Sequence, residues 1–465
     1  MRIVRQAALA GLLALAFPWA GPWGATQARA ETLADSLAAG YESSGVLEQN
    51  RAVLRAADED VAQAVAALRP VVSFVTSFQA ANPGSPLARN SVAGFSGGTT
   101  LGLRASLTLY DFGRRELLIA QQKEAVLATR QALLDVEQQV LLRVAQAYLE
   151  VRRSAAFVGL RQNNVRLISE ELRAAQDRFE VGEVTRTDVA LAESSLAAAR
   201  SALSAEEGGL VQAREEFRAA VGRLPGDLAP APPARIPYTL DQATEVALRT
   251  RPNLLQAQHQ VAQAEIAVAA TEATLRPSIA ATGGFQLDQD LDDSASSIGL
   301  ELSAPIYQGG AGASTVRQAQ AQRDSSRASL LTVARDVRQD VANAFSAIEV
   351  ARASQQAFEQ QVVAADIAFS GVREEATLGA RTTLDVLDAE QELLNARANL
   401  VSSQVDESVA SYQLLTAMGL MTAQNLGLAV QVYDPTAYYD LVDDAPAARS
   451  ERGEALDRVL QSIAR

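Results

Sequence analysis

The sequence predicts a mainly α-helical protein with a smaller β component, in which one structural unit occurs twice. Three observations predict this class: long stretches of helical periodicity, short segments that alternate apolar and polar residues, and an internal duplication. The chain has 465 residues, of which 48% are hydrophobic and only 5% aromatic. Such a composition is typical of long packed helices, so we expect one elongated molecule rather than several compact domains.

The composition disfavours catalytic and nucleic-acid-binding functions. The chain has no cysteine and a single histidine, His259, so it lacks the residues for a thiol nucleophile, a cysteine-ligated zinc site or a histidine-rich metal site. A net charge of −14 disfavours nucleic acid, whose phosphates require a concentrated basic surface. We expect no enzyme activity, no cofactor, no metal site and no nucleic-acid partner, and we expect His259 to be a solvated helix residue.

Residues 1–30 have the pattern of a secretory signal peptide. Two arginines precede an apolar run over residues 7–17, and residues 28–30 read Ala-Arg-Ala, which is a small-x-small cleavage site. A membrane anchor is the alternative, but the apolar run is shorter than the roughly 20 residues of a spanning helix. We therefore expect an exported protein whose mature chain begins at Glu31.

The remainder of the chain contains an internal duplication. Residues 32–70 match residues 239–277 without a gap, and residues 101–224 match a stretch that lies 197 positions later. The matched glycines are not explained by shared helical periodicity. The predicted divisions are a signal peptide over 1–30, a first structural repeat over 31–224, a proline-rich linker over 225–238, a second repeat over 239–421, and a C-terminal equatorial segment with a flexible tail over 422–465.

Each repeat is predicted to begin with a helix, which two strands follow. Apolar and polar residues alternate over 101–109 and 298–306, and the partner strands, 71–79 and 278–287, each follow a Leu-Arg-Pro sequence. These lengths fit the roughly 9–11 residues of a tilted transmembrane β-strand. A water-soluble sandwich is the alternative. Because four strands cannot close a barrel, exposure to lipid would require strands from other copies of the chain.

The longest predicted elements are helices over residues 114–179 and 311–376, neither of which contains proline. At 1.5 Å per residue each would extend about 100 Å. A helix of this length buries its apolar stripe only against neighbours of similar length, as in a coiled coil or a helical barrel. Shorter helices are predicted over residues 186–221 and 383–418, so that each repeat ends in a helical hairpin.

The turns of the two hairpins share one sequence pattern. Gly182 and Gly379 occupy the position after a helix end where a left-handed residue is needed, and Thr-x-x-Asp capping boxes follow them. Capping explains Asp188 and Asp385 as well as a functional role does. Asp388 lies one turn beyond Asp385 and has no capping role. If identical chains surround an axis, Asp385 and Asp388 form a ring of negative charge, which is a cation site and a constriction.

Taken together, these features resemble the TolC-type outer-membrane factors, the outer membrane efflux protein family. The resemblance covers the mature chain to about Leu428 and rests on the duplication, the Leu-Arg-Pro helix ends and the sequence LGARTTLDVLDA at 378–389. It implies a homotrimer in which each chain gives four strands to one twelve-stranded transmembrane β-barrel, continuous with a long periplasmic α-helical barrel. It also implies a place in the outer membrane of a Gram-negative envelope, with an extension into the periplasm.

The resemblance also implies roles for residues in the hairpin turns. Asp385 and Asp388 match the aspartate rings that constrict the periplasmic entrance, and Arg381 with Asp188 matches an ion pair that holds the gate between the two hairpins. Ala376 departs from the family pattern, which often has an aromatic residue three positions before the hairpin glycine.

The hairpin tips match the segments that meet a periplasmic adaptor protein. These residues are Val181, Gly182, Glu183, Leu378, Gly379 and Ala380. Glu183 departs from the apolar residue that is common at its position, so the first tip differs from the family pattern.

The function implied is a passive, gated export duct that receives its energy from a partner. The expected partners are two further copies of the chain, a periplasmic adaptor protein, outer-membrane lipid, and an inner-membrane transporter that is either an ATP-binding cassette protein or proton-driven. The cargo is then a secreted polypeptide of a type I system, small toxic compounds, or both. A channel for multidrug efflux only is one alternative, and a periplasmic coiled-coil scaffold that never enters the membrane is a remote one.

Overall fold

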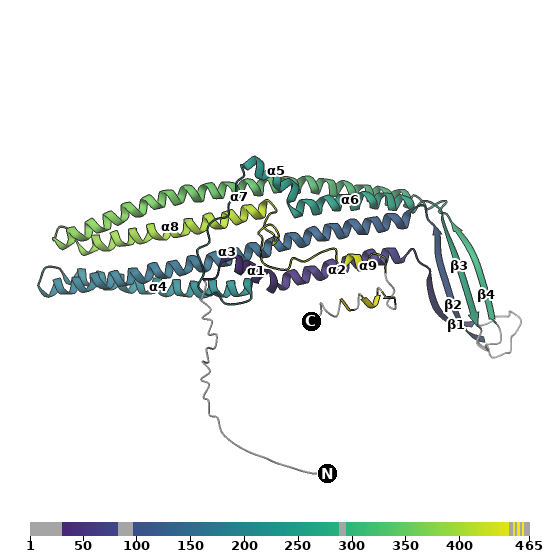
Figure 1. Ribbon diagram of the computed structural model, residues 1–465, viewed down its shortest axis with the longest axis horizontal. Helices are drawn as coiled ribbons and strands as arrows, with labels where there is room; N and C mark the ends of the chain where they lie inside the picture. The colour runs from purple at the N-terminus through teal and green to yellow at the C-terminus, as the bar shows by residue number, and fades with distance from the viewer. Residues whose placement is uncertain are drawn as a thin grey trace, which may run out of the picture.

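The structure is a computed structural model that describes residues 30–81, 96–287 and 294–445, together with 450, 451, 453–455, 458 and 459. Except for Ala30, the predicted signal peptide lies outside these residues. The molecule is elongated: long helices lie side by side along its length, and a β-sheet leaves one end at an angle to them (Figure 1).

Both repeats have the same order of elements. The first repeat comprises α1 (Leu33–Ser43), α2 (Gly45–Ala66), β1 (Val71–Ala81), β2 (Ser96–Tyr110), α3 (Arg114–Glu180) and α4 (Arg186–Val221). The second comprises α5 (Leu240–Thr250), α6 (Pro252–Ala273), β3 (Ser278–Leu287), β4 (Ser294–Ser303), α7 (Ala311–Thr377) and α8 (Thr383–Ala417), and a short helix, α9 (Tyr439–Val442), comes later. The two predicted long helices are confirmed, since α3 and α7 have 67 residues each.

The helix that opens each repeat is divided into two, which differs from the single helix predicted. Ser44 has extended backbone angles, and its hydroxyl accepts a hydrogen bond from the Leu47 backbone N–H, so that it caps α2. In the second repeat Arg251 is extended because Pro252 follows it, and a proline ring disfavours the helical conformation of the preceding residue. A serine cap therefore sets the first break and a proline sets the second.

The four strands form one antiparallel sheet in the order β1-β2-β3-β4. The central pairing joins the two repeats, with Ser106 of β2 opposite Thr282 of β3. Strand β4 ends at Ser303 rather than at residue 306 as predicted. Pro305 explains the early end, because proline has no N–H to donate to a neighbouring strand. Strands β1 and β4 are the two edges.

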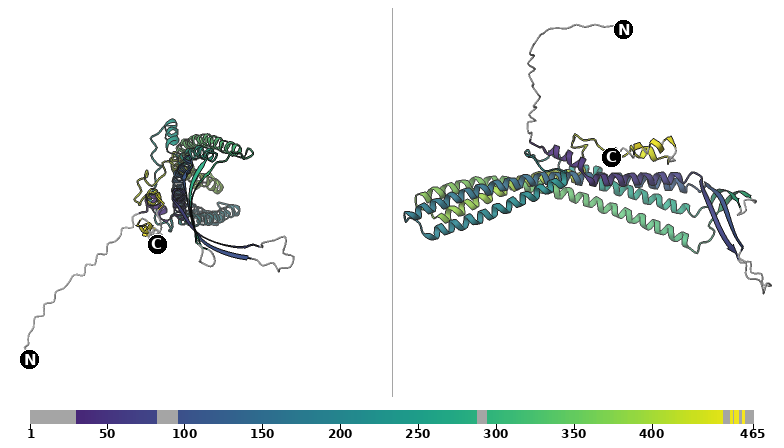
Figure 2. Two further views of the ribbon diagram at one scale, coloured as in Figure 1. Left: turned by 90° about the vertical axis from the view of Figure 1, so that its right-hand side faces the viewer. Right: turned by 90° about the horizontal axis from the view of Figure 1, so that it is seen from below.

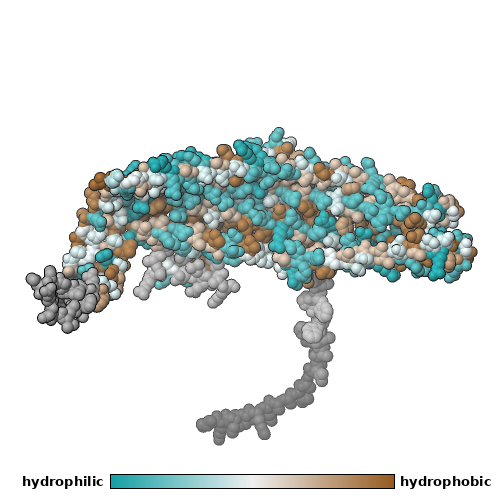
Figure 3. Space-filling view, turned by 180° about the vertical axis from the view of Figure 1, so that it is seen from behind, coloured by the Kyte–Doolittle hydropathy of each residue, from teal (hydrophilic) through white to brown (hydrophobic). Residues whose placement is uncertain are grey.

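The sheet has one apolar and one polar face. Ile298 and Leu300 of β4 are 95% and 76% exposed, and Phe74 and Phe78 of β1, on the same face, are 66% and 72% exposed. The opposite face is hollowed and mostly polar. Its lining includes Ser77, Thr100, Arg104, Thr282, Gln286, Ser297 and Glu301. Hydrophobic patches lie at the sheet end of the space-filling view (Figure 3). The predicted alternation is therefore present, and the apolar face is uncovered in the single chain.

Helix α3 is the central element of the helical part. It packs against α4 in the first hairpin, against α2 and α6 towards the sheet, and against α8 of the second hairpin. In the part of the chain that the structure describes, no helix has both the length and the apolar content needed to cross a membrane.

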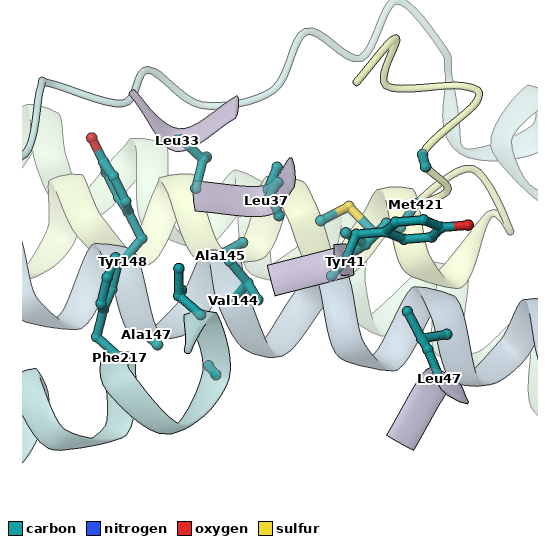
Figure 4. Close-up of a cluster of buried hydrophobic side chains, with 14 of the residues drawn as sticks. Leu33, Leu37, Tyr41, Leu47, Val144, Ala145, Ala147, Tyr148, Phe217 and Met421 are labelled. Carbon is teal, nitrogen blue, oxygen red and sulfur yellow. The ribbon is translucent and has the colours of Figure 1, made fainter. Parts of the chain in front are cut away.

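A buried cluster near the middle of the molecule joins α3 to its neighbours (Figure 4). Tyr148 of α3 and Phe217 of α4 are both fully buried, and Met421 packs into the same cluster from beyond α8. The Tyr148 hydroxyl lies 2.6 Å from the carbonyl oxygen of Ala229 and 2.9 Å from that of Glu31. The cluster therefore fixes the linker between the repeats as well as the helices.

Glu31, the predicted first residue of the mature chain, is held by several bonds. Its carboxylate accepts hydrogen bonds of 3.0 and 2.8 Å from the Arg223 guanidinium, and its backbone N–H donates to the Asp227 carbonyl at 2.7 Å. These bonds close the first repeat, because they tie its start to the residues that follow α4.

Residues 433–445, which we expected to belong to a flexible tail, pack against α2. The Tyr438 hydroxyl donates a 2.6 Å hydrogen bond to Glu59, and the Arg69 guanidinium donates to the carbonyl oxygens of Asp444 and Ala445. Residues 433–445 therefore lie along α2 and are held at their end by Arg69, just beyond that helix.

His259 is paired rather than solvated as we predicted. Its Nδ1 lies 2.8 Å from Glu124 Oε2, and the side chains are only 29% and 26% exposed. The contact joins α6 to α3. Sequence alone did not reveal it because the two residues are 135 positions apart.

Candidate functional site

The two hairpins end together at the end of the molecule farthest from the sheet (Figures 1 and 2). Gly182 and Gly379 have φ values of 82° and 74°, in the left-handed region that favours glycine. The following residue of each turn donates its N–H to a carbonyl five positions back, at 2.9 Å in both hairpins. The predicted left-handed residues are therefore present, and the bonds give both turns the Schellman pattern.

Both predicted capping boxes are present. The Asp188 carboxylate accepts hydrogen bonds from the backbone N–H and the hydroxyl of Thr185, at 2.9 and 2.8 Å. Asp385 accepts the same two bonds from Thr382, both at 2.9 Å. These bonds, first the backbone bond and then the hydroxyl bond, lower the pKa of each carboxyl below its ordinary value. Both tips therefore carry a fixed, ionised aspartate.

The residues of the tips are open to solvent. Val181 and Leu378 are 72% and 78% exposed, so each tip presents an apolar side chain beside its glycine. Asp388 is exposed one turn beyond Asp385, whereas Leu387 between them is buried. The acidic pair thus lies on the solvent side of α8, where it can act as a charged surface.

Within one chain the structure does not bring Arg381 to Asp188. The Arg381 Nε donates a 2.9 Å hydrogen bond to Glu375, and this bond raises the pKa of the guanidinium. Among the described residues the Asp188 carboxylate bonds only to Thr185. Each predicted member of the gate pair is therefore held by its own hairpin.

Sequence reasoning missed the polar side chains that join the two hairpins. Glu390 of α8 is 3% exposed and accepts a 2.8 Å hydrogen bond from the Asn164 side chain of α3. Nearby, Arg373 Nε of α7 lies 3.2 Å from Glu171 Oε1 of α3. The available signal was the place of Glu390, one turn beyond Leu387 on the apolar stripe of α8, where a carboxylate requires a partner.

Comparison with known proteins agrees with this architecture. The profile of the outer membrane efflux protein family matches residues 42–223 and 243–420. The outer membrane efflux protein BepC of Brucella suis is 37% identical over 424 residues, which cover 90% of this chain and 91% of BepC. The outer membrane protein TolC of Escherichia coli is 26% identical over 353 residues, or 71% of each chain.

The fold agrees with a solved outer-membrane protein as well. The crystal structure of the outer membrane protein VceC from Vibrio cholerae superposes on this chain with a TM-score of 0.71 at 20% sequence identity. The superposition covers 83% of this chain and 96% of the VceC chain. The two ranges that match the family profile cover most of each repeat, and the overall fold recurs in a protein of known structure. The chain therefore belongs to the outer membrane efflux protein family and is an outer-membrane efflux channel.

Proposed function

We propose that this chain forms the outer-membrane exit duct of a tripartite export system and conducts its cargo passively, under the control of a gate at the hairpin tips. The observation that carries the proposal is the polarity of the molecule. A sheet with an exposed apolar face lies at one end, and two matched hairpin tips with exposed acidic residues lie at the other. Such a molecule suits a duct with one end in the membrane and the other in the periplasm.

The sheet supports assembly into a homotrimer. Both of its edges lack a partner strand within the described residues, and four strands cannot enclose a pore. Pairing β4 of one copy with β1 of the next would close three sheets into a twelve-stranded barrel. The apolar faces would then meet lipid, and the polar faces, with Arg104 and Glu301, would line a wet interior.

In this assembly the tips would form the gate. Asp385 and Asp388 of three copies would surround one axis as a ring of negative charge, which favours cations at the constriction. We propose that Arg381 and Asp188 pair when the hairpins are closed in the trimer, with Arg381 exchanging its bond to Glu375 for one between hairpins.

The exposed tips are proposed to dock onto a periplasmic adaptor protein. Val181 and Leu378 offer apolar anchors, and Gly182, Gly379 and Ala380 leave the backbone accessible beside them, whereas Glu183 makes the first tip more polar. An inner-membrane transporter, an ATP-binding cassette protein or a proton-driven pump, would supply the energy.

The cargo is proposed to be an unfolded polypeptide, small toxic compounds, or both. The sequence TTLDVLD at 382–388 and the absence of cysteine for lipid attachment favour the type I branch over a channel for multidrug efflux only. Deleting the gene and comparing the secreted proteins with drug sensitivity would separate the two.

Single-channel conductance of the purified mature protein in planar bilayers tests the duct and its gate. We expect stable cation-selective steps, a loss of selectivity in Asp385→Ala/Asp388→Ala, and a higher conductance in Arg381→Ala. A pore whose selectivity and conductance do not change in these variants would support the duct but contradict the assignment of the gate residues. Failure to insert would favour the periplasmic scaffold.

A further inference from the structure

The two hairpins of one chain contact each other through few side chains near their tips. Leu387 of α8 is buried in an apolar cluster with Ile168 of α3 and with Leu196 and Ala199 of α4. This contact is small, because most apolar residues of the second hairpin pack within that hairpin. Any movement of one hairpin away from the other must therefore break this cluster and the polar contacts beside it.

Two polar contacts flank the cluster. Asn164 donates its 2.8 Å bond to one carboxylate oxygen of Glu390, and both residues are buried, at 4% and 3% exposure. The other oxygen, Oε2, is buried and has no hydrogen-bond partner among the described residues. Arg373 reaches across to α3, where it lies 3.2 Å from Glu171 and 4.0 Å from Glu170.

Burial opposes the ionisation of Glu390, and the charges that face it act in both directions. From α3, Glu171 adds a like charge and Arg166 an opposite one, and from α7, Arg373 adds a second opposite charge. Burial outweighs the hydrogen bond from Asn164 and these arginines, and it raises the pKa of Glu390 from 4.5 to about 7. A carboxylate that is buried with one oxygen unpaired is costly, whereas a neutral carboxyl group in the same place costs much less.

We propose that Glu390, Asn164, Glu171 and Arg373 form a proton-dependent latch that holds the two hairpins of each chain together. The inference rests on the proposed function, because the same hairpins form the proposed gate. With Glu390 protonated, the contact between α8 and α3 closes at little electrostatic cost. When Glu390 ionises, its charge is relieved by separating the hairpins and admitting water.

The direction of the pH effect follows from the two states of Glu390. In the closed contact its pKa is about 7, and in separated hairpins it returns towards the ordinary 4.5. The latch is therefore at full strength below pH 4.5, weakens as the pH rises, and is lost above pH 7. The equilibrium constant for opening should rise roughly tenfold for each unit by which the pKa is raised.

The test is single-channel recording of the full mature channel while the pH on the tip side is varied from about 5 to 8. We expect the open probability to rise with pH in the wild type. Glu390→Gln keeps the shape but cannot ionise, so this variant should stay closed throughout, as the wild type does in acid. Glu392→Gln, on an exposed position of the same helix, is the matched control and should keep the wild-type response.

A second variant covers the case in which Glu390→Gln does not assemble. Glu171→Gln removes the neighbouring negative charge, so the midpoint of the pH response should move to lower pH. As an independent readout, a spin label on Ala380→Cys in this cysteine-free chain should report wider separations between copies at pH 8 than at pH 5.

The outcomes separate this inference from the proposed function. A channel that responds to pH equally in the wild type and in Glu390→Gln, or whose midpoint does not move in Glu171→Gln, would overturn the latch and leave the duct intact. A protein that forms no channel at any pH would overturn the duct itself.

Discussion

Asp188 and Asp385 each combine two roles at the hairpin tips. Each carboxylate satisfies the free N–H groups at the start of a helix and also places a negative charge at the tip. Because these bonds lower their pKa values below the ordinary 3.8, the two groups contribute stability above that pH and lose it only as the pH falls through the lower values. The tip charges therefore persist over the range in which Glu390 titrates.

Thr185→Ala tests the capping role without changing any charge. The substitution removes the hydroxyl that accepts from the Asp188 N–H at 3.3 Å, and the loss of an N-cap costs about 1 kcal/mol. Hydrogen exchange should become faster for the amides of the first turn of α4, residues 186–189. Thr187→Ala, in the same exposed turn, is the control, and equal exchange in the two variants would argue against the cap.

Local features of single residues were predictable, and distant pairs were not. The left-handed conformation of Gly182 and Gly379 was predictable, because the residue after a helix end often adopts it and glycine adopts it most easily. The bond between Asn164 and Glu390 joins residues 226 positions apart, and no local rule specifies it. Arg381 shows a different limit, because its partner in the single chain, Glu375, is only six positions away on the same hairpin and was still not predicted.

At the scale of elements, the long helices were the most predictable part of the molecule. Their periodicity continues over many turns without proline, so α3 and α7 begin at the predicted residues and end within one residue of the prediction. Two boundaries were not predicted, because each depends on one residue. Pro252 sets the division between α5 and α6, and Pro305 sets the early end of β4. Single prolines changed the boundaries and left the order of elements intact.

Tyr148→Phe tests how the linker is held to the helices. The substitution removes the hydroxyl of a fully buried side chain, so the carbonyl oxygens of Glu31 and Ala229 lose a hydrogen-bond donor. We expect a loss of about 1–3 kcal/mol in the free energy of unfolding, read as a lower melting temperature by circular dichroism. Tyr110→Phe, on the exposed part of the sheet, should leave the melting temperature unchanged. A melting temperature as high as that of the wild type would show that the linker does not depend on this hydroxyl.

At the scale of the whole molecule, the composition and the long helices predicted the elongated shape, and the alternation of residues predicted the two-faced sheet. The arrangement of copies could not be read from one chain, because the edges of the sheet and the acidic tips would meet only in the proposed assembly. The family resemblance supplied that arrangement as an expectation, and the exposed apolar face of β4 supports it.

Leu300→Arg tests the outward direction of the sheet. An arginine at this position would face lipid in the proposed barrel, at a cost of roughly 2–4 kcal/mol near the middle of the bilayer. We expect much less trimer in the outer membrane. Ser297→Arg, which lies on the polar face of the same strand, should assemble normally. If the two variants assembled equally well or equally poorly, the two faces of the sheet would not differ in their contact with lipid, which would contradict the proposed orientation.

The central pairing of the sheet has a consequence for the order in which the chain is made. With the signal peptide predicted at residues 1–30, the first repeat would enter the periplasm first. The bonds of Glu31 to Arg223 and Asp227 lie wholly within the first half of the chain. That half can thus complete its own helical hairpin while the edge of β2 that later pairs with β3 is still unpaired. Export in this order would leave an unpaired strand edge exposed until β3 arrives, so the export machinery rather than the finished channel would have to protect it.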